Sequence, residues 1–160
     1  MTHTLIATSV VRGSHQGESH GGVYLIDLQQ QSVEQVIDWN PVDIDWRGRG
    51  WDRALRGIAF DGDRVFIAAS NELFVYNADF ELQACYRNPY LMHCHEIFVY
   101  QRRLYLSSTG FDTILGFDLD KNCFCFGLHI VRVGANFQGA PFDPEGDGGP
   151  GAGNRLHINN

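Results

Sequence analysis

The chain has 160 residues, of which 44% are hydrophobic, which is enough for one domain with a hydrophobic core and too short for two ordinary domains. Its formal net charge of −7 offers no basic surface, so neither a nucleic acid nor a membrane is expected as a partner. No stretch approaches the roughly 20 apolar residues of a membrane-spanning helix, and the expected location is the cytoplasm. Four cysteines without a C-x-x-C pair are expected to stay reduced and buried.

The first forty residues predict three strands, at "LIATSVV", "GVYLIDL" and "SVEQVIDW", because apolar and β-branched side chains alternate or cluster in each stretch. The connection between the first two strands, "VRGSHQGESHGG", is long and rich in glycine, so we expect it to be mobile. It carries His15 and His20, which are candidate substrate-binding residues.

A polar connection, "NPVDIDWRGRGWDRA", follows these strands. Tryptophans beside arginines can stack on a planar or sugar-like ligand, so this connection contributes four further candidate substrate-binding residues. They are Asp45, Trp46, Arg49 and Trp51. The alternative is that both tryptophans only cover the end of a sheet.

A repeat occupies the middle of the chain. "RGIAFDGDRVFIAAS" at 56–70 aligns without a gap on "HEIFVYQRRLYLSST" at 95–109. Each copy predicts a strand, a polar turn and a second strand, and two more strands follow each copy. Four antiparallel strands that repeat at about 40 residues describe a β-propeller blade, because one such sheet cannot bury both faces alone. We therefore expect an all-β fold with about three propeller blades of four antiparallel strands per chain.

The blades are expected at 4–40, 54–88 and 93–130, with the first strand of blade one missing. A glycine-rich loop is expected at 131–154, where no periodicity is evident, and an orphan first strand at 155–160. Closed propellers have about four blades or more, so two chains that exchange terminal strands as a homodimer would form a six-bladed ring. The alternative, that the chain is part of a longer propeller, stays open.

The blade pattern over residues 4–130 resembles the six-bladed propellers of the NHL, gluconolactonase and peptidyl-hydroxyglycine amidating lyase type. The phrases "CHEI", "STGFD" and "LHINN" resemble those of an uncharacterised bacterial propeller family. Gluconolactonases hold a divalent ion with acidic and amide groups, and the amidating lyases hold zinc with histidines. The resemblance therefore implies metal-dependent chemistry, and this sequence is nearer to the histidine pattern.

Superposition of the three predicted first strands places Arg56, His95 and His157 at one equivalent position. First strands line the channel of a propeller, so we expect the two histidines to bind a divalent ion such as zinc, iron or manganese. Arg56 would orient an anionic substrate. His93, at the mouth of the same strand as His95, is a candidate substrate-binding residue, and Asp112 of "STGFD" is a candidate catalytic carboxylate. The alternative is that each histidine only hydrogen-bonds a loop carbonyl.

Two functions follow from these observations. The first is a metal-dependent enzyme, such as a hydrolase or lyase, that acts on a small polar or anionic substrate at the mouth of the channel. The second is a non-catalytic propeller scaffold that binds a ligand or a protein. Fold alone does not choose between them.

Overall fold

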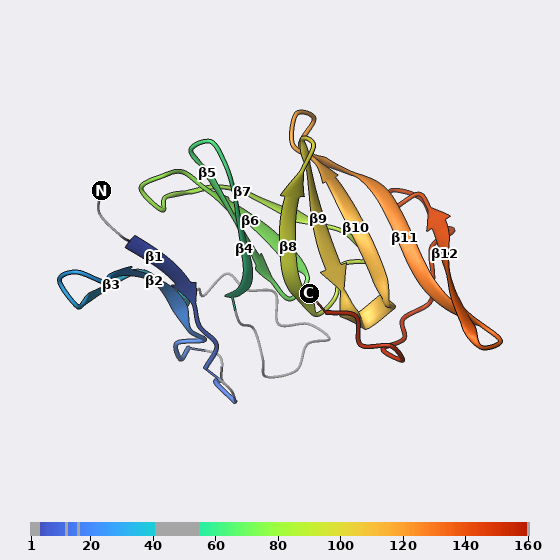
Figure 1. The fold of residues 1–160 in the computed structure, drawn as a ribbon, viewed down its shortest axis with the longest axis horizontal. Helices are drawn as coiled ribbons and strands as arrows, with labels where there is room; N and C mark the ends of the chain where they lie inside the picture. Colours follow the sequence, from blue (N-terminus) through green and yellow to red (C-terminus); the bar gives the residue numbers. More distant parts are fainter. Residues whose placement is uncertain (1–3, 12, 16, 41–54, 160) are drawn as a thin grey trace. The chain divides into compact units, whose positions relative to one another are not determined.

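The fold is built from β-strands. The computed structural model describes residues 4–11, 13–15, 17–40 and 55–159. These residues form antiparallel sheets of three, four and five strands (Figure 1), which confirms the predicted all-β, propeller-like fold class. The chain divides into two compact units, residues 1–56 and 57–160. Within the described part of the chain, no helix is long and apolar enough to cross a membrane.

The first unit contains a three-stranded sheet. Its strands, in sheet order, are β1 (Thr4–Thr8), β2 (Gly22–Asp27) and β3 (Ser32–Asp38). Residues beyond β1 continue the pairing, because the Ser9 N–H donates to Gly22 O at 2.9 Å and the Val11 N–H donates to His20 O at 3.0 Å. The connection between β1 and β2, expected to be mobile, is therefore tied to the sheet at these residues.

The second sheet has four strands. They are, in sheet order, β4 (Leu55–Asp61), β5 (Arg64–Ala69), β6 (Glu72–Tyr76) and β7 (Leu82–Arg87). Gly62 lies in the turn between β4 and β5 with a φ of 59°, a left-handed conformation that glycine adopts without a steric penalty. Phe66, Val75 and Ala84 pair in register across β5, β6 and β7, so a row of apolar side chains runs across one face.

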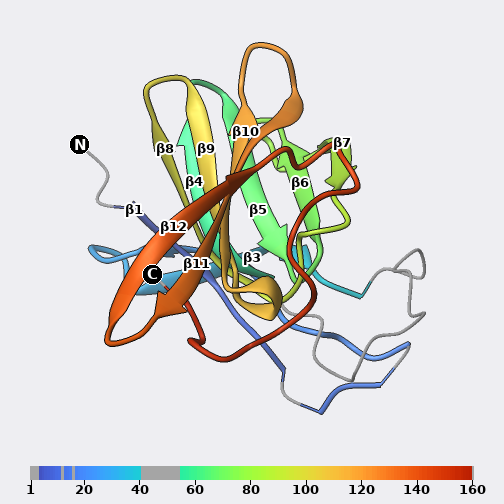
Figure 2. The ribbon, with the colours of Figure 1, turned by 90° about the vertical axis from the view of Figure 1, so that its right-hand side faces the viewer.

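The third sheet has five strands, one more than a propeller blade. Its elements are β8 (Cys94–Tyr100), β9 (Arg103–Ser108), the short 3-10 helix η1 (Thr109–Phe111), β10 (Thr113–Asp118), β11 (Cys123–Val133) and β12 (Asn136–Phe142). The sheet order is β8-β9-β10-β11-β12, and Figure 2 shows β11 and β12 as a hairpin along one edge.

The hairpin β11–β12 corrects the expectation of a loop at 131–154. Val133 pairs with Asn136, and Gly134 has a φ of 63°, as a two-residue hairpin turn requires. The lack of periodicity predicts a loop here, but β12 is an edge strand, where Pro141 needs no N–H partner on its free side. From Asp143 onward the chain has no further strand in the described residues.

The internal repeat matches the observed strand boundaries. β4 and β8 begin at Leu55 and Cys94, and β5 and β9 begin at Arg64 and Arg103, which keeps the offset found in the sequence. Within the second unit the second and third sheets share one hydrophobic core. Tyr86 of β7 and Phe117 of β10 meet in it with ring centroids 4.8 Å apart. The two sheets therefore stack face to face, as consecutive blades do.

Close approach at the first strands depends on one glycine. A Cβ atom on Gly57 of β4 would lie 2.7 Å from the main-chain nitrogen of Ile97 in β8, which is too short for a real contact. A residue without a side chain is needed at that point.

Candidate functional site

His95 and His157 lie side by side in the second unit. Their ring centroids are 5.6 Å apart, and the ring planes meet at 71°. His95 is the second residue of β8 and is partly buried, whereas His157 is exposed. The sequence placed these two residues at equivalent positions of successive first strands, and the structure brings their imidazoles together.

A β-bulge sets the position of His95. Cys94 pairs with Ser108 and Ile97 pairs with Leu106, so β8 has one extra residue between these pairs, at His95 and Glu96. The Ser107 hydroxyl bridges the gap, because it accepts from the Glu96 N–H at 3.0 Å and donates to Glu96 O at 3.2 Å. Bulges redirect side chains at the ends of strands and are frequent beside functional sites.

Residues 153–159, here called the terminal segment, hold His157 in place through Asp112. The Asp112 carboxylate accepts main-chain hydrogen bonds from Arg155 at 2.8 Å, from Leu156 at 3.1 and 3.2 Å, and from His157 at 3.1 Å. Asp112 is 4% exposed and has a left-handed conformation with a φ of 49°. Aspartate tolerates this conformation better than most residues. Asp112 thus positions the main chain beside the histidine pair, and its predicted catalytic role stays a prediction.

The turn that contains Asp112 makes further contacts with the terminal segment. The Thr109 hydroxyl donates to Ile158 O at 2.6 Å, and the Gly153 N–H donates to Gly110 O at 2.9 Å. The expected orphan strand at 155–160 is not a strand in its described residues, because its N–H groups bind this turn in place of a neighbouring strand.

Ser108 of the same turn has a structural role. It is fully buried, its hydroxyl donates to Tyr90 O at 2.6 Å, and it accepts from the Met92 N–H at 2.9 Å. These bonds join the turn to the segment that leads into β8. A buried hydroxyl held in this way is not placed to act as a nucleophile.

The histidine pair alone does not make a complete metal site. Among the described residues, no group of three or more His, Cys, Asp or Glu side chains is arranged to hold an ion. His157 Nδ1 lies 3.1 Å from Asn154 Oδ1, a bond that orients the ring. Two imidazoles supply two ligands, so an ion there would need further ligands from water, substrate or another chain.

The other predicted site residues are dispersed. Arg56 is the second residue of β4 and belongs to the first unit, so its convergence with the histidines stays a prediction. His93 is exposed and precedes β8 with a φ of 53°. His15 is exposed, whereas His20 is 1% exposed and hydrogen-bonded to the Ser14 hydroxyl. A side chain this deeply buried cannot contact a substrate in the described conformation.

Four candidate residues cannot be placed. Asp45, Trp46, Arg49 and Trp51 lie outside the described residues. The cysteines correct one expectation: of the four, only Cys94 is buried.

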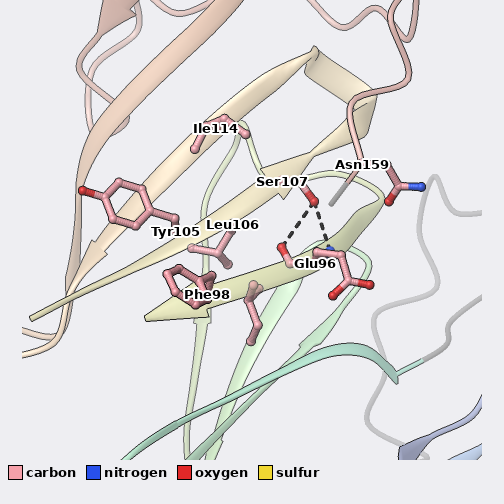
Figure 3. Close-up of a pocket in the computed structure, with 8 residues that line it drawn as sticks. Glu96, Phe98, Tyr105, Leu106, Ser107, Ile114 and Asn159 are labelled. Atoms are coloured by element: carbon pink, nitrogen blue, oxygen red, sulfur yellow. Dashed lines mark hydrogen bonds between the residues drawn. The ribbon is translucent and has the colours of Figure 1, made fainter. Parts of the chain in front are cut away.

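A second feature, which the sequence did not indicate, is a pocket of about 350 Å³ on the third sheet. Its lining includes Glu96, Phe98, Tyr105, Ser107, Ile114 and Asn159 (Figure 3). The pocket lies on one side of the third sheet, which we call the outer face. The outer face consists of the side chains that point to this side from β8, β9, β10 and β11. They are Phe98, Tyr105, Ser107, Ile114, Phe126 and Leu128. Phe98 is 67% exposed, so a large apolar ring faces solvent there.

A network of ion pairs lies away from the histidines, at the hairpin turns. Asp61 binds both Arg64 and Arg102, and Arg102 also binds Asp120. The hydrogen bond from Arg64, followed by the charge of Arg102, lowers the pKa of Asp61, against an opposing effect of burial. This network joins turns of the second and third sheets and carries no free acid or base for chemistry.

Comparisons with known proteins identify the fold alone. No protein family and no curated protein matches the chain. Among solved structures, a chain of a nidogen/laminin complex matches 79% of this chain with a TM-score of 0.57 and 11% identity. Sqt1 of Saccharomyces cerevisiae matches 78% with a TM-score of 0.52 and 9% identity. A chain of the mitotic checkpoint complex matches 94% with a TM-score of 0.52 and 10% identity.

These neighbours are propeller-like. The chain spans 43%, 39% and 47% of their respective lengths, which is less than half of each. The second and third sheets of this chain are therefore stacked propeller blades, and nothing in the likeness favours the NHL type over other propellers.

Proposed function

We propose that this chain is a propeller-type scaffold that binds a protein partner through the outer face of the third sheet. The observation that carries the proposal is the exposure of Phe98 over an apolar pocket formed with Tyr105 and Ile114. Exposed contiguous apolar surface is a mark of protein interaction sites. Aromatic side chains in pockets supply much of the binding energy of such surfaces.

The structural neighbours support this choice. Two of the three come from protein assemblies, the nidogen/laminin complex and the mitotic checkpoint complex. At 9–11% identity they carry no partner over to this chain, but they are examples of propellers within protein complexes.

Affinity capture followed by reconstitution tests the scaffold. Phe98→Asp places a charge on the outer face, and Leu82→Asp on β7 is the matched control because Leu82 is 56% exposed on the second sheet. We expect wild type and the control to retain one protein that the Phe98 variant loses. The purified pair should then show a dissociation constant at least tenfold weaker for Phe98→Asp. Equal binding by all three proteins, or no specific binding of any protein, a second copy of this chain included, would refute the proposal.

The second candidate is a metal-dependent enzyme that acts on a small polar or anionic substrate. The paired imidazoles of His95 and His157 support it, as does the resemblance to NHL, gluconolactonase and amidating lyase propellers. In this reading the histidines hold zinc, iron or manganese, Arg56 orients the substrate, and Asp112 acts as base or as the residue that positions His157.

Elemental analysis tests the metal site. We expect purified protein to carry a divalent ion that is lost in both His95→Ala and His157→Ala but kept in His129→Ala, a variant on β11 outside the pair. Metal-free wild-type protein after growth in zinc, iron and manganese would remove this candidate.

The assembly also belongs to this proposal. Two copies would close one ring as a homodimer, and a longer polypeptide that supplies the remaining blades is the alternative. Four cysteines without a C-x-x-C pair suit the reducing cytoplasm proposed from the sequence.

A further inference from the structure

The outer face of the third sheet is the repeat equivalent of a surface that is buried elsewhere in the same unit. In the second sheet, two apolar rows cross the strands in register. They are Phe66, Val75 and Ala84, and Ala68, Leu73 and Tyr86. In the third sheet the rows at the same blade positions are Tyr105, Gly116 and Phe126, and Ser107, Ile114 and Leu128.

The two sets of rows differ in what covers them. Phe66, Ala68 and Leu73 are fully buried because the third sheet packs on them in a shared core. On the outer face, Tyr105 and Ile114 are only partly buried. In the second sheet, this surface is covered by the apolar side of another antiparallel sheet. The apolar side of a further blade is therefore the surface that fits the outer face.

The terminal segment already lies where the first strand of such a blade belongs. Between the second and third sheets, the Cys94 N–H at the start of β8 donates to Ser70 O at 2.7 Å. Thr109 is the repeat equivalent of Ser70, and its hydroxyl binds Ile158 O at 2.6 Å. The imidazole ring of His157 meets that of His95 edge to face. In both cases, the residue that follows the second strand of one blade binds the segment in the position of the following blade's first strand. Ser70 binds the start of β8, and Thr109 binds the terminal segment.

Asn159 extends this arrangement into the pocket. It lines the pocket together with Glu96, and Glu96 is the repeat equivalent of Gly57. The main chain of β8 approaches Gly57 so closely that no Cβ fits. The terminal segment passes the same point of the third sheet, where the Glu96 side chain points away from the Ser107 bridge (Figure 3).

The sheet β1–β2–β3 has the complementary form. Its strands match the second, third and fourth strands of a blade, and within the described residues β1 has a strand partner on one side only, at β2. Ile6 pairs with Leu25, and the two residues occupy the blade positions of Leu106 and Leu115. In the third sheet, Leu106 and Leu115 pack into the core shared with the second sheet.

We infer that the outer face, together with the terminal segment, is a docking site for the β1–β2–β3 sheet of a second copy of this chain. In this arrangement β1 of the second copy pairs with the terminal segment, and the row of Ile6 and Leu25 covers Phe98, Tyr105 and Ile114. The inference rests on the proposed function and names its partner.

Twofold symmetry makes this docking occur twice, and a mixing experiment follows from that. Phe98→Asp damages the outer face of a chain, and Ile6→Asp damages its β1–β2–β3 sheet. Either variant alone damages both interfaces of its homodimer. In a mixed dimer both substitutions fall in one interface, and the other interface is intact.

Light scattering of the purified chains measures the result. We expect a mass of two chains for wild type and for the control Leu82→Asp, one chain for each variant alone, and recovery of two-chain mass when the variants are mixed. Circular dichroism shows whether each variant keeps its strands, and Phe98→Ala, which adds no charge, gives a second variant. A wild-type mass of one chain overturns the inference, as does a dimer that Ile6→Asp leaves intact.

The outcomes separate the inference from the proposed function. A monomer that still retains another protein in a manner sensitive to Phe98→Asp keeps the scaffold and removes the second copy as its partner. A monomer that retains nothing removes both.

Discussion

Substitution of Asp112 by asparagine should release the terminal segment. The carboxylate accepts N–H groups from three consecutive residues, with Arg155 on Oδ2 and His157 on Oδ1. The asparagine side chain has one carbonyl oxygen in place of two carboxylate oxygens, so the variant loses at least one of these hydrogen bonds. The hydrogen bonds that remain go to a neutral acceptor. A hydrogen bond to a charged group contributes about 1.5–3 kcal/mol, which corresponds to an increase of about 10- to 150-fold in the opening equilibrium of the segment.

Amide hydrogen exchange of residues 153–159 measures this opening. We expect exchange in Asp112→Asn to accelerate by that factor in the terminal segment, while β9 and β10 keep their protection. Asp143→Asn is the matched control, since Asp143 is exposed and accepts a local main-chain bond from Glu145 at 3.0 Å, which asparagine can also accept. Unchanged exchange of the segment in Asp112→Asn would refute the role assigned to this carboxylate.

Three further predictions concern stability. Gly57→Ala should lower the free energy of unfolding by roughly 1–3 kcal/mol, because its Cβ would lie 2.7 Å from the main-chain nitrogen of Ile97; urea denaturation measures it. Leu106→Ala should lower it by about 2–5 kcal/mol, because Leu106 is fully buried between the sheets. The hydrogen bond from Arg64, followed by the charge of Arg102, holds the pKa of Asp61 below its ordinary 3.8. The ionised Asp61 carboxylate therefore stabilises the folded state fully at pH values above 3.8, and this stabilisation is lost as the pH falls through the lowered pKa. Asp61→Asn should therefore flatten the acid limb of the urea midpoint plotted against pH.

Controls for these variants come from exposed positions. Gly148→Ala meets no atom within 4 Å, and Leu82→Ala alters a side chain that is 56% exposed, so both should change stability by less than about 0.5 kcal/mol. Equal losses in test and control would contradict the packing argument. If the urea midpoint of Asp61→Asn fell with decreasing pH as steeply as that of wild type, the acid dependence would not come from the Asp61 network.

The blade repeat was predictable because its signal is local and occurs twice. The alternation of apolar side chains in 56–70 and 95–109 sets strands and turns, and the turn at Gly62 needs only a residue that tolerates a positive φ. The pairing of His95 with His157 was also predictable, since repeat positions put both at the start of a first strand.

Other features depend on contacts that no local pattern reports. β12 was missed because Gly139 and Pro141 weaken a strand in general, yet a sheet edge accepts both. The role of Asp112 arises from main-chain N–H groups more than forty residues away, and backbone donors leave no trace in the side-chain pattern. The outer face was missed because its apolar residues have the same alternation as buried ones, and only coordinates show that nothing in the described residues covers Phe98.

The central claim is that the terminal segment stands in the place of a next first strand, with His157 beside His95. The most direct measurement is a nuclear Overhauser contact between the imidazole ring protons of these two residues in histidine-labelled protein. The account predicts a cross-peak in wild type that weakens in Asp112→Asn. A folded wild-type protein without that cross-peak would contradict it.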